Sequence, residues 1–405
     1  MPSGSPFRAP TLPTRRFGLL STYPPKLCGL ATFAAALESG LQLGGHRVDI
    51  VRIDDGRDGD VVQRPVAAEL VNGVPASIRK AAMTLSRCDV AIIQHEYGIY
   101  GGADGDEVLD LLEALAVPTI VVLHTVPLHP TTRQKSILEA IGRLADRLVV
   151  MTETGKDRLT ANYRVDLTKV QVIPHGASVP THETQSSAEL AFEAEFETDL
   201  IADAAADRPG LLTWGLLGPG KGIEHAIDAL TLLRDRRPRL RYTVAGVTHP
   251  KVFAQFGDVY RQSLIQKCWA GGIANSVVFD DTYRGVARLT RFVESATAVV
   301  LPYDSRDQVT SGVLVDAIAA GRPVIATGFP HAVELLSSGA GIIVPHEDPV
   351  ALADAMLAIT SDPELLASMT AEARRIAPSL SWEAVARTYA HLSEDIIALA
   401  EQIAI

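Results

Sequence analysis

Two segments in the second half of the sequence contain the residue types that bind phosphate. Residues 215–222 (GLLGPGKG) follow an apolar run and include Lys221, and residues 310–312 (TSG) begin a run with helical spacing. A helix N-terminus offers an anion its backbone N–H groups and a partial positive charge. Asp316, one turn further on, has the group that accepts hydrogen bonds from ribose hydroxyls. The pattern predicts a site for a nucleoside diphosphate.

The first of these segments also matches most of the phosphate loop of ATPases. It reads Gly-x-x-x-x-Gly-Lys from Gly215 to Lys221. In an ATPase the next residue is a serine or threonine whose hydroxyl binds Mg²⁺, whereas here Gly222 follows the lysine. The missing hydroxyl and the position in the middle of the chain disfavour an ATPase.

Polar side chains also follow two apolar runs in the first half. His95, Glu96 and Tyr97 come after residues 90–94, and His124 comes after residues 119–123. The first three either contact a substrate or close the turn before a glycine, and His124 is either functional or a hydrogen-bonded structural histidine. No second histidine follows His95 at the spacing of a zinc protease, so that class of metal site is excluded.

Parallel β-sheets are the elements that would position these residues. Apolar runs alternate with helical patterns throughout the chain, which is typical of βαβ units with a sheet buried on both faces. In such sheets ligands bind beyond the carboxyl ends of the strands. The expected strands are 17–21, 47–52, 90–94, 119–123, 148–151, 170–173, 211–215, 241–245, 277–279, 298–301, 324–326 and 341–344.

The order of these runs predicts two doubly wound Rossmann-like domains. Residues 1–14 are rich in proline and are expected to be a flexible tail. A polar stretch in the middle interrupts the alternation and predicts a partly helical linker. The expected parts are a first domain at 15–180, the linker at 181–208, a second domain at 209–385 and a terminal helix at 386–405.

Composition limits the class of protein. The chain has 405 residues, 47% of them hydrophobic, and a formal net charge of −11, which argues against nucleic-acid binding. The three cysteines are scattered and predict neither disulfides nor a zinc site, so a reducing cytoplasm is expected. No apolar leader or membrane-spanning run is present, so contact with the inner face of a membrane would be peripheral.

The segment 301–336 resembles the retaining GT-B glycosyltransferases of family 4. Their signature is Glu, seven residues, then Glu, and the two positions here are Gln308 and Asp316. Both depart from the usual glutamate. In the family, the first position and the backbone after it touch the donor sugar, and the second binds the ribose. The resemblance extends from about Arg16 to Tyr389 and implies two domains that face a central cleft.

The resemblance also gives expectations for single residues. Lys221 matches the family lysine that binds the diphosphate, while Leu216 replaces the family arginine, so Arg284 and Arg306 are candidate replacements. His124 matches a histidine that contacts the donor sugar and stabilises charge in the transition state.

Two further positions are expected to be less directly involved. His175 stands where the family usually has asparagine and is expected to be structural, and Glu334 lies near the nucleotide or is a solvated helix charge. The full set expected to bind the donor is Gly29, Gly218, Gly220, Lys221, Gln308, Ser311, Gly312, Val313, Leu314 and Asp316.

The function implied by the resemblance is transfer of a hexose from a nucleoside diphosphate sugar to an acceptor hydroxyl, with retention at the anomeric carbon. GDP-mannose is the first donor expected and UDP-glucose the next; the acceptor is a glycan, a lipid-linked sugar or a small molecule. His124 and Lys221 are the expected catalytic residues, and neither a cofactor nor a metal is expected. Two alternatives remain open, namely a sugar-nucleotide epimerase of the same fold and a protein that binds a sugar nucleotide without catalysis.

Overall fold

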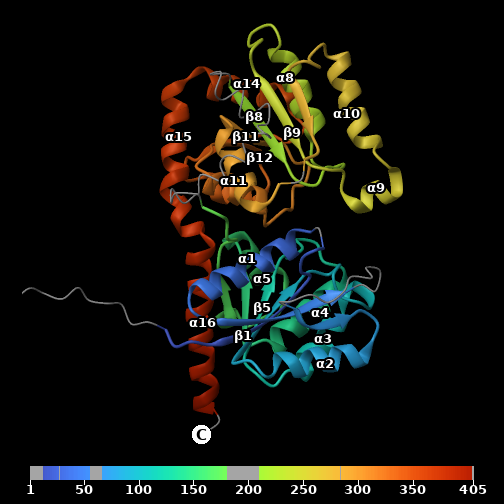
Figure 1. Cartoon of the computed structure of the whole chain (residues 1–405), viewed down its shortest axis with the longest axis vertical. Coiled ribbons are helices and arrows are strands. Elements are labelled where there is room, and N and C mark those ends of the chain that lie inside the picture. Colours follow the sequence, from blue (N-terminus) through green and yellow to red (C-terminus); the bar gives the residue numbers. More distant parts are fainter. Residues whose placement is uncertain (1–11, 27, 55–65, 180–208, 283, 404–405) are drawn as a thin grey trace, which may run out of the picture. The chain divides into compact units, whose positions relative to one another are not determined.

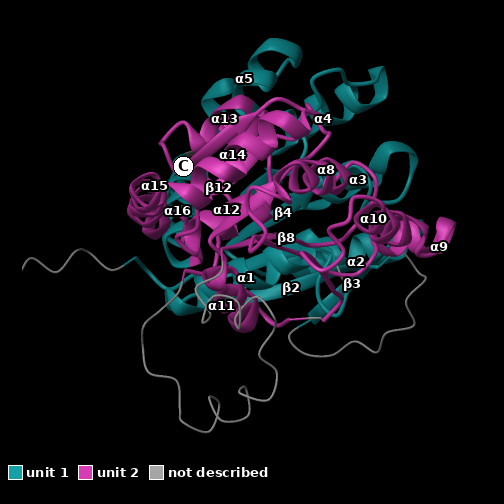
Figure 2. Cartoon of the chain, turned by 90° about the horizontal axis from the view of Figure 1, so that it is seen from above, with its two compact units in different colours: residues 1–151, 155–173, 383–405 teal, residues 152–154, 174–382 magenta. Residues whose placement is uncertain are grey.

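The computed structural model describes residues 12–26, 28–54, 66–179, 209–282 and 284–403. The expected linker at 181–208 and most of the expected tail at 1–14 lie outside these residues. The described chain divides into two compact units (Figures 1 and 2). Unit 1 contains Met1–Met151, Gly155–Ile173 and Glu383–Ile405, and unit 2 contains Thr152–Thr154 and Pro174–Trp382.

Unit 1 is built on a seven-stranded sheet with the order β3-β2-β1-β4-β5-β6-β7, in which all neighbouring strands are parallel. Helices connect the strands, as βαβ units require. The strands are β1 (Arg16–Ser21), β2 (Arg47–Asp54), β3 (Val66–Val71), β4 (Val90–His95), β5 (Thr119–Leu123), β6 (Arg147–Val150) and β7 (Val170–Val172). The helices are α1 (Gly29–Leu43), α2 (Pro75–Leu85), α3 (Glu107–Ala114), α4 (Thr132–Leu144), α5 (Glu153–Asn162) and α16 (Trp382–Ile403).

Unit 2 repeats the plan with a six-stranded sheet in the order β10-β9-β8-β11-β12-β13, again parallel throughout. Its strands are β8 (Gly210–Trp214), β9 (Arg241–Ala245), β10 (Val277–Asp280), β11 (Ala298–Leu301), β12 (Val324–Thr327) and β13 (Gly341–Val344). Its helices are α8 (Ile223–Leu233), α9 (Pro250–Phe256), α10 (Val259–Ala270), α11 (Val286–Ser295), α12 (Gly312–Ala319), α13 (Pro330–Leu336), α14 (Pro349–Ser361) and α15 (Pro363–Ile376).

Side chains on both faces of the unit 2 sheet are buried, which explains why its strands read as continuous apolar runs. Along β8, Leu212 and Trp214 belong to one buried cluster, while Leu211 belongs to a second. Successive residues of a strand point to opposite faces, so the two clusters lie on the two sides of the sheet. The candidate site residues of this unit lie beyond the strand ends.

Local signals set the helix boundaries. Asp348 and Asp362 each accept backbone hydrogen bonds at the start of a helix whose first residue is proline. At the start of α4, the side chains of Thr131 and Gln134 form a reciprocal capping box with the backbone. In the part of the chain that the structure describes, no helix combines the length and apolar character that crossing a bilayer requires.

The observed strands agree with the expected ones to within two or three residues at each end, with one addition. Strand β3 was not expected, since its sequence VAAELV is short and weakly apolar, and it lies at the edge of the sheet. The unit boundaries also differ from the expected ones. The first boundary falls at residues 173 and 174 and not at 180, and the second falls at 382 and 383 and not at 385.

Helix α16 packs on unit 1, as the terminal helix of the resembled family implies. Its buried residues Val385, Tyr389, Ser393 and Ile396 recur at helical spacing. Near its end, Glu394 accepts two hydrogen bonds from the guanidinium of Arg15, at 2.7 and 2.8 Å. The last helix of the chain thus closes the unit that the first strand begins.

Candidate functional site

The glycine-rich loop between β8 and α8 has the backbone conformation of a phosphate-binding loop. Gly220 and Gly222 have φ angles of 89° and 62°, which residues other than glycine rarely adopt. A Cβ atom on Gly222 would lie 1.7 Å from the carbonyl oxygen of Pro302. Glycine therefore lets the loop approach the segment that follows β11, and Asp304 donates its N–H to Gly220 there, at 3.1 Å.

Lys221 is a partly buried cation with no acidic partner among the described residues. Its ammonium nitrogen lies 4.4 Å from the centre of the Tyr303 ring, which holds it in place by a cation–π contact. Burial lowers the pKa of Lys221, and no carboxylate raises it. A cation held in this way, and not neutralised by the protein, is suited to an anionic ligand.

The N-terminus of α12 provides backbone donors beside this loop. The Ser311 hydroxyl caps the helix by accepting from the N–H of Leu314, at 3.3 Å. The N–H groups of Gly312 and Val313 are donated to no described residue. A Cβ atom on Gly215 would lie 3.8 Å from the side chain of Val313, so the start of the glycine-rich loop adjoins the first turn of α12.

One of the expected donors is used within the protein. The N–H of Ser311 donates to Nδ1 of His331 at 2.8 Å, and His331 is 5% exposed. Burial lowers the pKa of His331 to about 3, so the ring stays neutral and keeps this acceptor. Of Ser311, Gly312 and Val313, which were all expected to bind the donor, only Gly312 and Val313 therefore keep an N–H for a ligand.

Asp316 lies one turn into α12, where the sequence placed it. Burial raises its pKa to about 7, and no described lysine or arginine pairs with it. Near neutral pH a carboxyl group with this pKa is only partly ionised. A ligand that donates hydrogen bonds to the carboxylate stabilises its ionised form. Ribose hydroxyls are such donors.

The ring of His175 approaches the start of α12 closely. A Cβ atom on Gly312 would lie 3.1 Å from two atoms of this ring, so glycine is needed for the contact. Nδ1 of His175 also lies 2.6 Å from the carbonyl oxygen of Gly176, and the ring packs against Trp382 with centroids 5.5 Å apart. Burial lowers the pKa of His175 to about 4. These contacts agree with a structural role.

Several other expected residues of unit 2 have partners inside the protein. The Gln308 amide donates to the carbonyl oxygen of Thr310 at 2.9 Å, and the Leu314 side chain is fully buried. Gly218 faces the side chain of Val252, which a Cβ atom would approach to 3.3 Å. Leu314 therefore supports α12 from the core and does not present its side chain to a ligand.

The two arginines expected to replace the missing diphosphate cation differ in their surroundings. Arg284 forms a buried ion pair with Asp280, and its guanidinium stacks on Phe292 at 4.0 Å. The Arg306 side chain is 67% exposed and lies 3.8 Å from the carboxylate of Glu347. Arg284 is thus neutralised where it stands, whereas Arg306 has room to move.

Glu334 is occupied by backbone donors. Its carboxylate accepts from the N–H groups of Glu153 and Thr154, at 2.8 and 3.1 Å, and from the Thr154 hydroxyl at 3.1 Å. Glu153 and Thr154 belong, like Glu334, to unit 2, so the carboxylate is bonded within that unit. Its position is explained without a ligand, and it is not a solvated helix charge.

In unit 1, His124 is held by a residue that the sequence did not single out. Its Nε2 atom lies 2.5 Å from the side-chain oxygen of Gln94, and its ring meets Phe33 edge-on with centroids 5.0 Å apart. Gln94 is fully buried on β4. The pair fixes the orientation of the His124 ring at the carboxyl end of β5.

Gly29, at the start of α1, was expected to bind the donor. A Cβ atom added to it would meet no described atom within 4 Å.

The other candidates of unit 1 point inward. His95 is fully buried between Tyr97 and Tyr100, and neither ring nitrogen forms a hydrogen bond with a described residue. Burial lowers the pKa of His95 to about 4. Glu96 accepts from the Thr125 hydroxyl, and the Tyr97 hydroxyl donates to the carbonyl oxygen of Gln134 at 3.2 Å. The expectation that His95 contacts an acceptor is therefore corrected, because its ring does not reach the surface.

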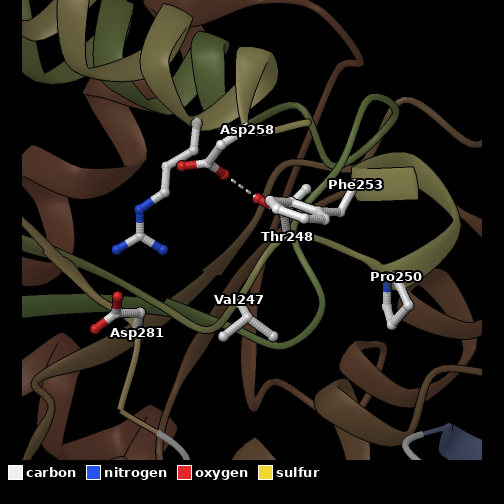
Figure 3. Close-up of a pocket in the computed structure, with 7 residues that line it drawn as sticks. Val247, Thr248, Pro250, Phe253, Asp258 and Asp281 are labelled. Atoms are coloured by element: carbon white, nitrogen blue, oxygen red, sulfur yellow. Dashed lines mark hydrogen bonds between the residues drawn. The ribbon is translucent and has the colours of Figure 1, made fainter. Parts of the chain in front are cut away.

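A pocket of about 400 Å³ lies beyond the ends of β9 and β10 (Figure 3). Its walls combine the apolar side chains of Val247 and Phe253 with the charged groups of Asp258, Arg261 and Asp281. The Arg261 guanidinium donates to the carbonyl oxygen of Gly246 at 2.8 Å, which fixes it at one wall. Flat apolar surface beside fixed polar groups suits a nucleobase.

The sequence missed two residues of the site, His331 and Gln94. Both lie in apolar surroundings, His331 inside α13 and Gln94 within β4, so no neighbouring polar motif drew attention to them. A polar side chain inside an apolar strand was the available signal for Gln94, since such a group must find a partner. For His331 the partner is a backbone N–H 20 residues away, which no local pattern reveals.

Two family models match the chain, one over each half. Residues 28–179 match the model described as Glycosyltransferase Family 4, and residues 208–362 match the model described as Glycosyl transferases group 1. Each covers less than half of the chain, and together they cover most of both units. These matches support a glycosyltransferase of the family 4 type.

Curated relatives carry glycosyltransferase names. The chain is 29% identical over 262 residues to a D-inositol 3-phosphate glycosyltransferase of Streptomyces coelicolor, with 61% of this chain and 54% of the relative covered. It is 24% identical to an alpha-D-kanosaminyltransferase of Streptomyces kanamyceticus, with 64% and 65% covered. The chain thus spans between half and two thirds of the length of these relatives. A D-inositol 3-phosphate glycosyltransferase of Paenarthrobacter aurescens is 25% identical, with 88% and 90% covered.

Solved structures show the fold. Anabaena HepE in complex with UDP superposes with a TM-score of 0.72 at 17% identity, covering 94% of this chain and all of that one. Sucrose-phosphate synthase from Thermosynechococcus elongatus gives 0.69 at 17% identity, covering 95% and 100%. The fold is GT-B, with two parallel-sheet Rossmann-like units. None of these matches supports the epimerase alternative.

Proposed function

We propose that this chain, which has the GT-B fold and matches glycosyltransferase models over both units, transfers a sugar from a nucleoside diphosphate sugar to an acceptor hydroxyl. One observation carries the proposal. The Lys221 cation has no acidic partner among the described residues, and it lies in a glycine-rich loop that adjoins two unused N–H groups of α12. A diphosphate needs that combination.

The same groups explain how the reaction would be accelerated. The diphosphate gains negative charge as its bond to the sugar breaks, and donors fixed in advance stabilise that charge where it develops. Lys221 and the N–H groups of Gly312 and Val313 are held in place by Tyr303 and by the Ser311 cap, so they need little rearrangement. Asp316 would bind the ribose in its ionised form.

We further propose that the transferred group is a hexose and that the anomeric configuration is retained. The acceptor would attack on the face that the diphosphate leaves, and a phosphate oxygen would take the proton. His124, held by Gln94, would contact the donor sugar. This route gives no step to a metal ion. The free thiols of Cys28, Cys88 and Cys268 agree with work in a reducing cytoplasm.

The proteins that resemble this chain guide the choice of donor and acceptor to test. GDP-mannose and UDP-glucose are the two donors to distinguish, and HepE, which binds UDP and UDP-glucose in its structures, favours the second. The names of the curated relatives make an inositol phosphate the first acceptor to test. We place the base in the pocket of Figure 3, where apolar side chains lie beside fixed polar groups.

A binding protein without catalysis is the second candidate. The position at which the family has its first glutamate holds Gln308, whose amide is already bonded to the backbone. The arginine of the diphosphate loop is also replaced, by Leu216. Such a protein would bind the donor and release it unchanged.

The test begins with thermal unfolding in the presence of GDP, UDP, ADP and dTDP, each at millimolar concentration. A ligand at 100 times its dissociation constant adds about 2.7 kcal/mol to the free energy of unfolding. We expect one base to raise the melting temperature clearly, and Lys221→Ala to remove the shift. Lys251→Ala, a change to an exposed lysine on α9, is the control.

The sugar nucleotide with the matching base is then incubated with inositol phosphates and simple glycosides. Formation of a glycoside with the donor's anomeric configuration supports the proposed transfer. Binding without any product favours the second candidate. If none of the nucleotides changes the melting temperature, the assignment of the diphosphate site is wrong.

A further inference from the structure

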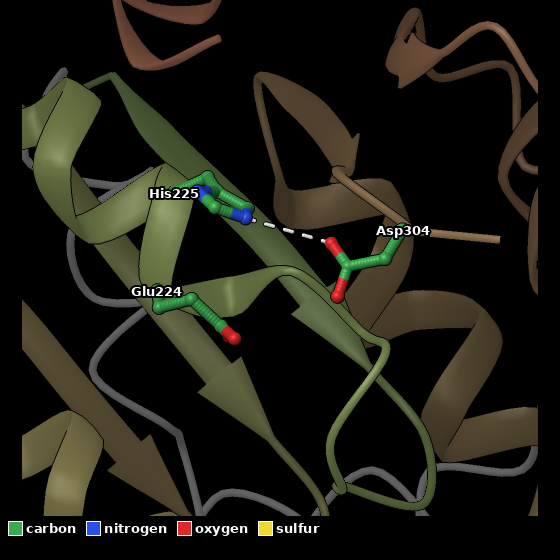
Figure 4. Close-up of side chains that lie close together, drawn as sticks. All are labelled: Glu224, His225 and Asp304. Carbon is green, nitrogen blue, oxygen red and sulfur yellow. Dashed lines mark ion pairs between the residues drawn. The ribbon is translucent and has the colours of Figure 1, made fainter. Parts of the chain in front are cut away.

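A second cluster of ionisable side chains lies where the glycine-rich loop leads into α8 (Figure 4). Glu224 and His225 are in the first turn of α8, and Asp304 is in the segment after β11. One ligand atom of each residue lies within 4.8 Å of the others, and Nε2 of His225 is 3.5 Å from Oδ1 of Asp304. The residues that the structure describes contain no other group of three or more such side chains with this spacing.

The three side chains converge because the backbone brings their elements together. Glycine at position 222 allows α8 to begin against the carbonyl oxygen of Pro302, and Asp304 donates its N–H to Gly220. The Tyr260 hydroxyl donates to the second carboxylate oxygen of Glu224 at 2.8 Å, which orients that group. In Figure 4 the His225 ring and the Asp304 carboxylate point toward each other, and the Glu224 carboxylate lies below them.

The charges within the cluster are not balanced. Two carboxylates lie close together, and no described lysine or arginine forms an ion pair with either. Oδ1 of Asp304 is shielded from water and accepts no hydrogen bond from any described residue, although Nε2 of His225 lies 3.5 Å away. A buried oxygen without a donor is costly unless a cation or proton occupies the space beside it.

The spacing suits a metal ion. Metal–ligand distances near 2.0–2.2 Å in tetrahedral geometry place ligand atoms about 3–4 Å apart, which the cluster reaches with small side-chain rotations. One imidazole and two carboxylates are a borderline ligand set that suits zinc, manganese or iron more than calcium or magnesium. The side chains of His225 and Asp304 are 23% and 32% exposed, so one side of the cluster is open to water ligands.

We propose that Glu224, His225 and Asp304 form a binding site for one divalent transition-metal ion. The ion would join the first turn of α8 to the segment after β11, and so fix the end of the glycine-rich loop that leads into α8. Tyr260 would act as an outer partner that orients Glu224. The site takes no part in sugar transfer and stands whether or not the proposed function is correct.

The test uses the full chain without an affinity tag, stripped with a chelator and then titrated with Zn²⁺, Mn²⁺ and Mg²⁺ in a calorimeter. We expect one Zn²⁺ or Mn²⁺ per chain and much weaker binding of Mg²⁺. With Co²⁺ the visible spectrum should show nitrogen and oxygen ligation, without the intense charge-transfer band of a thiolate ligand. Such a band would assign the metal to a cysteine and overturn the proposal.

Variants identify the ligands. His225→Gln and Asp304→Asn should weaken binding by about 100-fold or more, and Tyr260→Phe by about 10-fold, the lower end of what loss of an outer partner costs. Asp228→Asn is the matched control, since it removes a carboxylate of the same helix that pairs with Lys267. Circular dichroism in chelator checks that each variant folds. Binding unchanged in His225→Gln and Asp304→Asn, or no binding by the native chain, overturns the proposal.

Discussion

Similar polar residue types lie at the carboxyl ends of the two sheets, but they differ in how far the protein itself supplies their partners. In unit 1, His95, Glu96 and Tyr97 are bonded or enclosed within the protein, and His124 is held by Gln94. In unit 2, Lys221 lacks an acidic partner, and two N–H groups of α12 lack acceptors. The first edge encloses its polar side chains, whereas the second leaves a cation and two donors that the proposed anion would pair with.

This difference separates a scaffold from a binding site. In unit 1 the polar side chains at the ends of β4 and β5 are enclosed by aromatic rings or bonded within the unit, and no cation waits there for an anion among the described residues. Unit 2 keeps a cation, two donors and a carboxyl group with a raised pKa in one place, at a cost to its own stability. Substitutions at five residues would break or sharpen the comparison.

The largest effect is expected at Lys221. Lys221→Ala should lower turnover by about 10²–10³-fold, the scale of losing one fixed donor to the transition state, while the melting temperature changes little. Steady-state kinetics with the donor found in the thermal panel measures this. Lys251→Ala should retain full turnover. Equal rates for the two variants would remove Lys221 from the mechanism.

The next largest effect is on stability, at two glycines of the same loop. Both have positive φ, so alanine costs about 1–2 kcal/mol of backbone strain at either. At Gly222 the new methyl group also meets the carbonyl oxygen of Pro302, which adds about 1–3 kcal/mol of overpacking, whereas at Gly220 it meets no atom within 4 Å. In urea denaturation, the free energy of unfolding should be lower for Gly222→Ala than for Gly220→Ala. The reverse order would mean that the loop is looser than its contacts suggest.

A smaller effect, of about tenfold, is expected in the pH dependence of donor binding. Since the pKa of Asp316 is about 7, the ionised fraction, and with it the affinity for a sugar nucleotide, should rise about tenfold between pH 6 and pH 8. Asp316→Asn should bind more weakly at pH 8 and show a flat profile. A sugar nucleotide is used because it has no phosphate that titrates in this range.

Unliganded stability gives the control for that experiment. A carboxyl group whose pKa is raised on folding contributes most below its unfolded pKa of about 4, and the contribution is lost as the pH rises through 7. The native chain should therefore lose stability relative to Asp316→Asn over that interval. A parallel loss in both proteins would assign the effect to other groups.

The smallest effect is expected in unit 1. Tyr97→Phe removes a hydrogen bond to the Gln134 carbonyl oxygen and should cost about 0.5–1.5 kcal/mol of stability, with turnover unchanged. Chemical denaturation and the transfer assay measure the two quantities. A tenfold loss of turnover at full stability would show that this edge also contacts substrate, and the comparison would fail.

Much of the fold could be predicted from the sequence because strands buried on both faces are continuous apolar runs. The exception, β3, lies at a sheet edge, where alternating and small residues suffice and the apolar signal fades. The positions of Lys221 and Asp316 could also be predicted, since glycines and a cap mark helix starts. What could not be predicted was which polar groups are already satisfied.

That limit has a physical origin. Whether Ser311 offers its N–H to a ligand depends on His331, and whether Arg284 is free depends on Asp280 and Phe292. These partners are decided by packing between elements, which a single sequence shows only as separate residues. The same holds for His95, whose position at a strand end looks identical whether the ring faces water or the core.

The return of α16 to unit 1 has a consequence for how the protein is made. Synthesis proceeds from the N-terminus, so the strands of unit 1 leave the ribosome long before Val385, Tyr389 and Ile396, which are buried in the folded protein, have been joined to the chain. Arg15 must likewise wait for Glu394. Unit 2 can complete its folding first, although its strands are translated later. Nascent unit 1 therefore carries an uncovered apolar surface for most of translation, which is a natural place for a chaperone to bind.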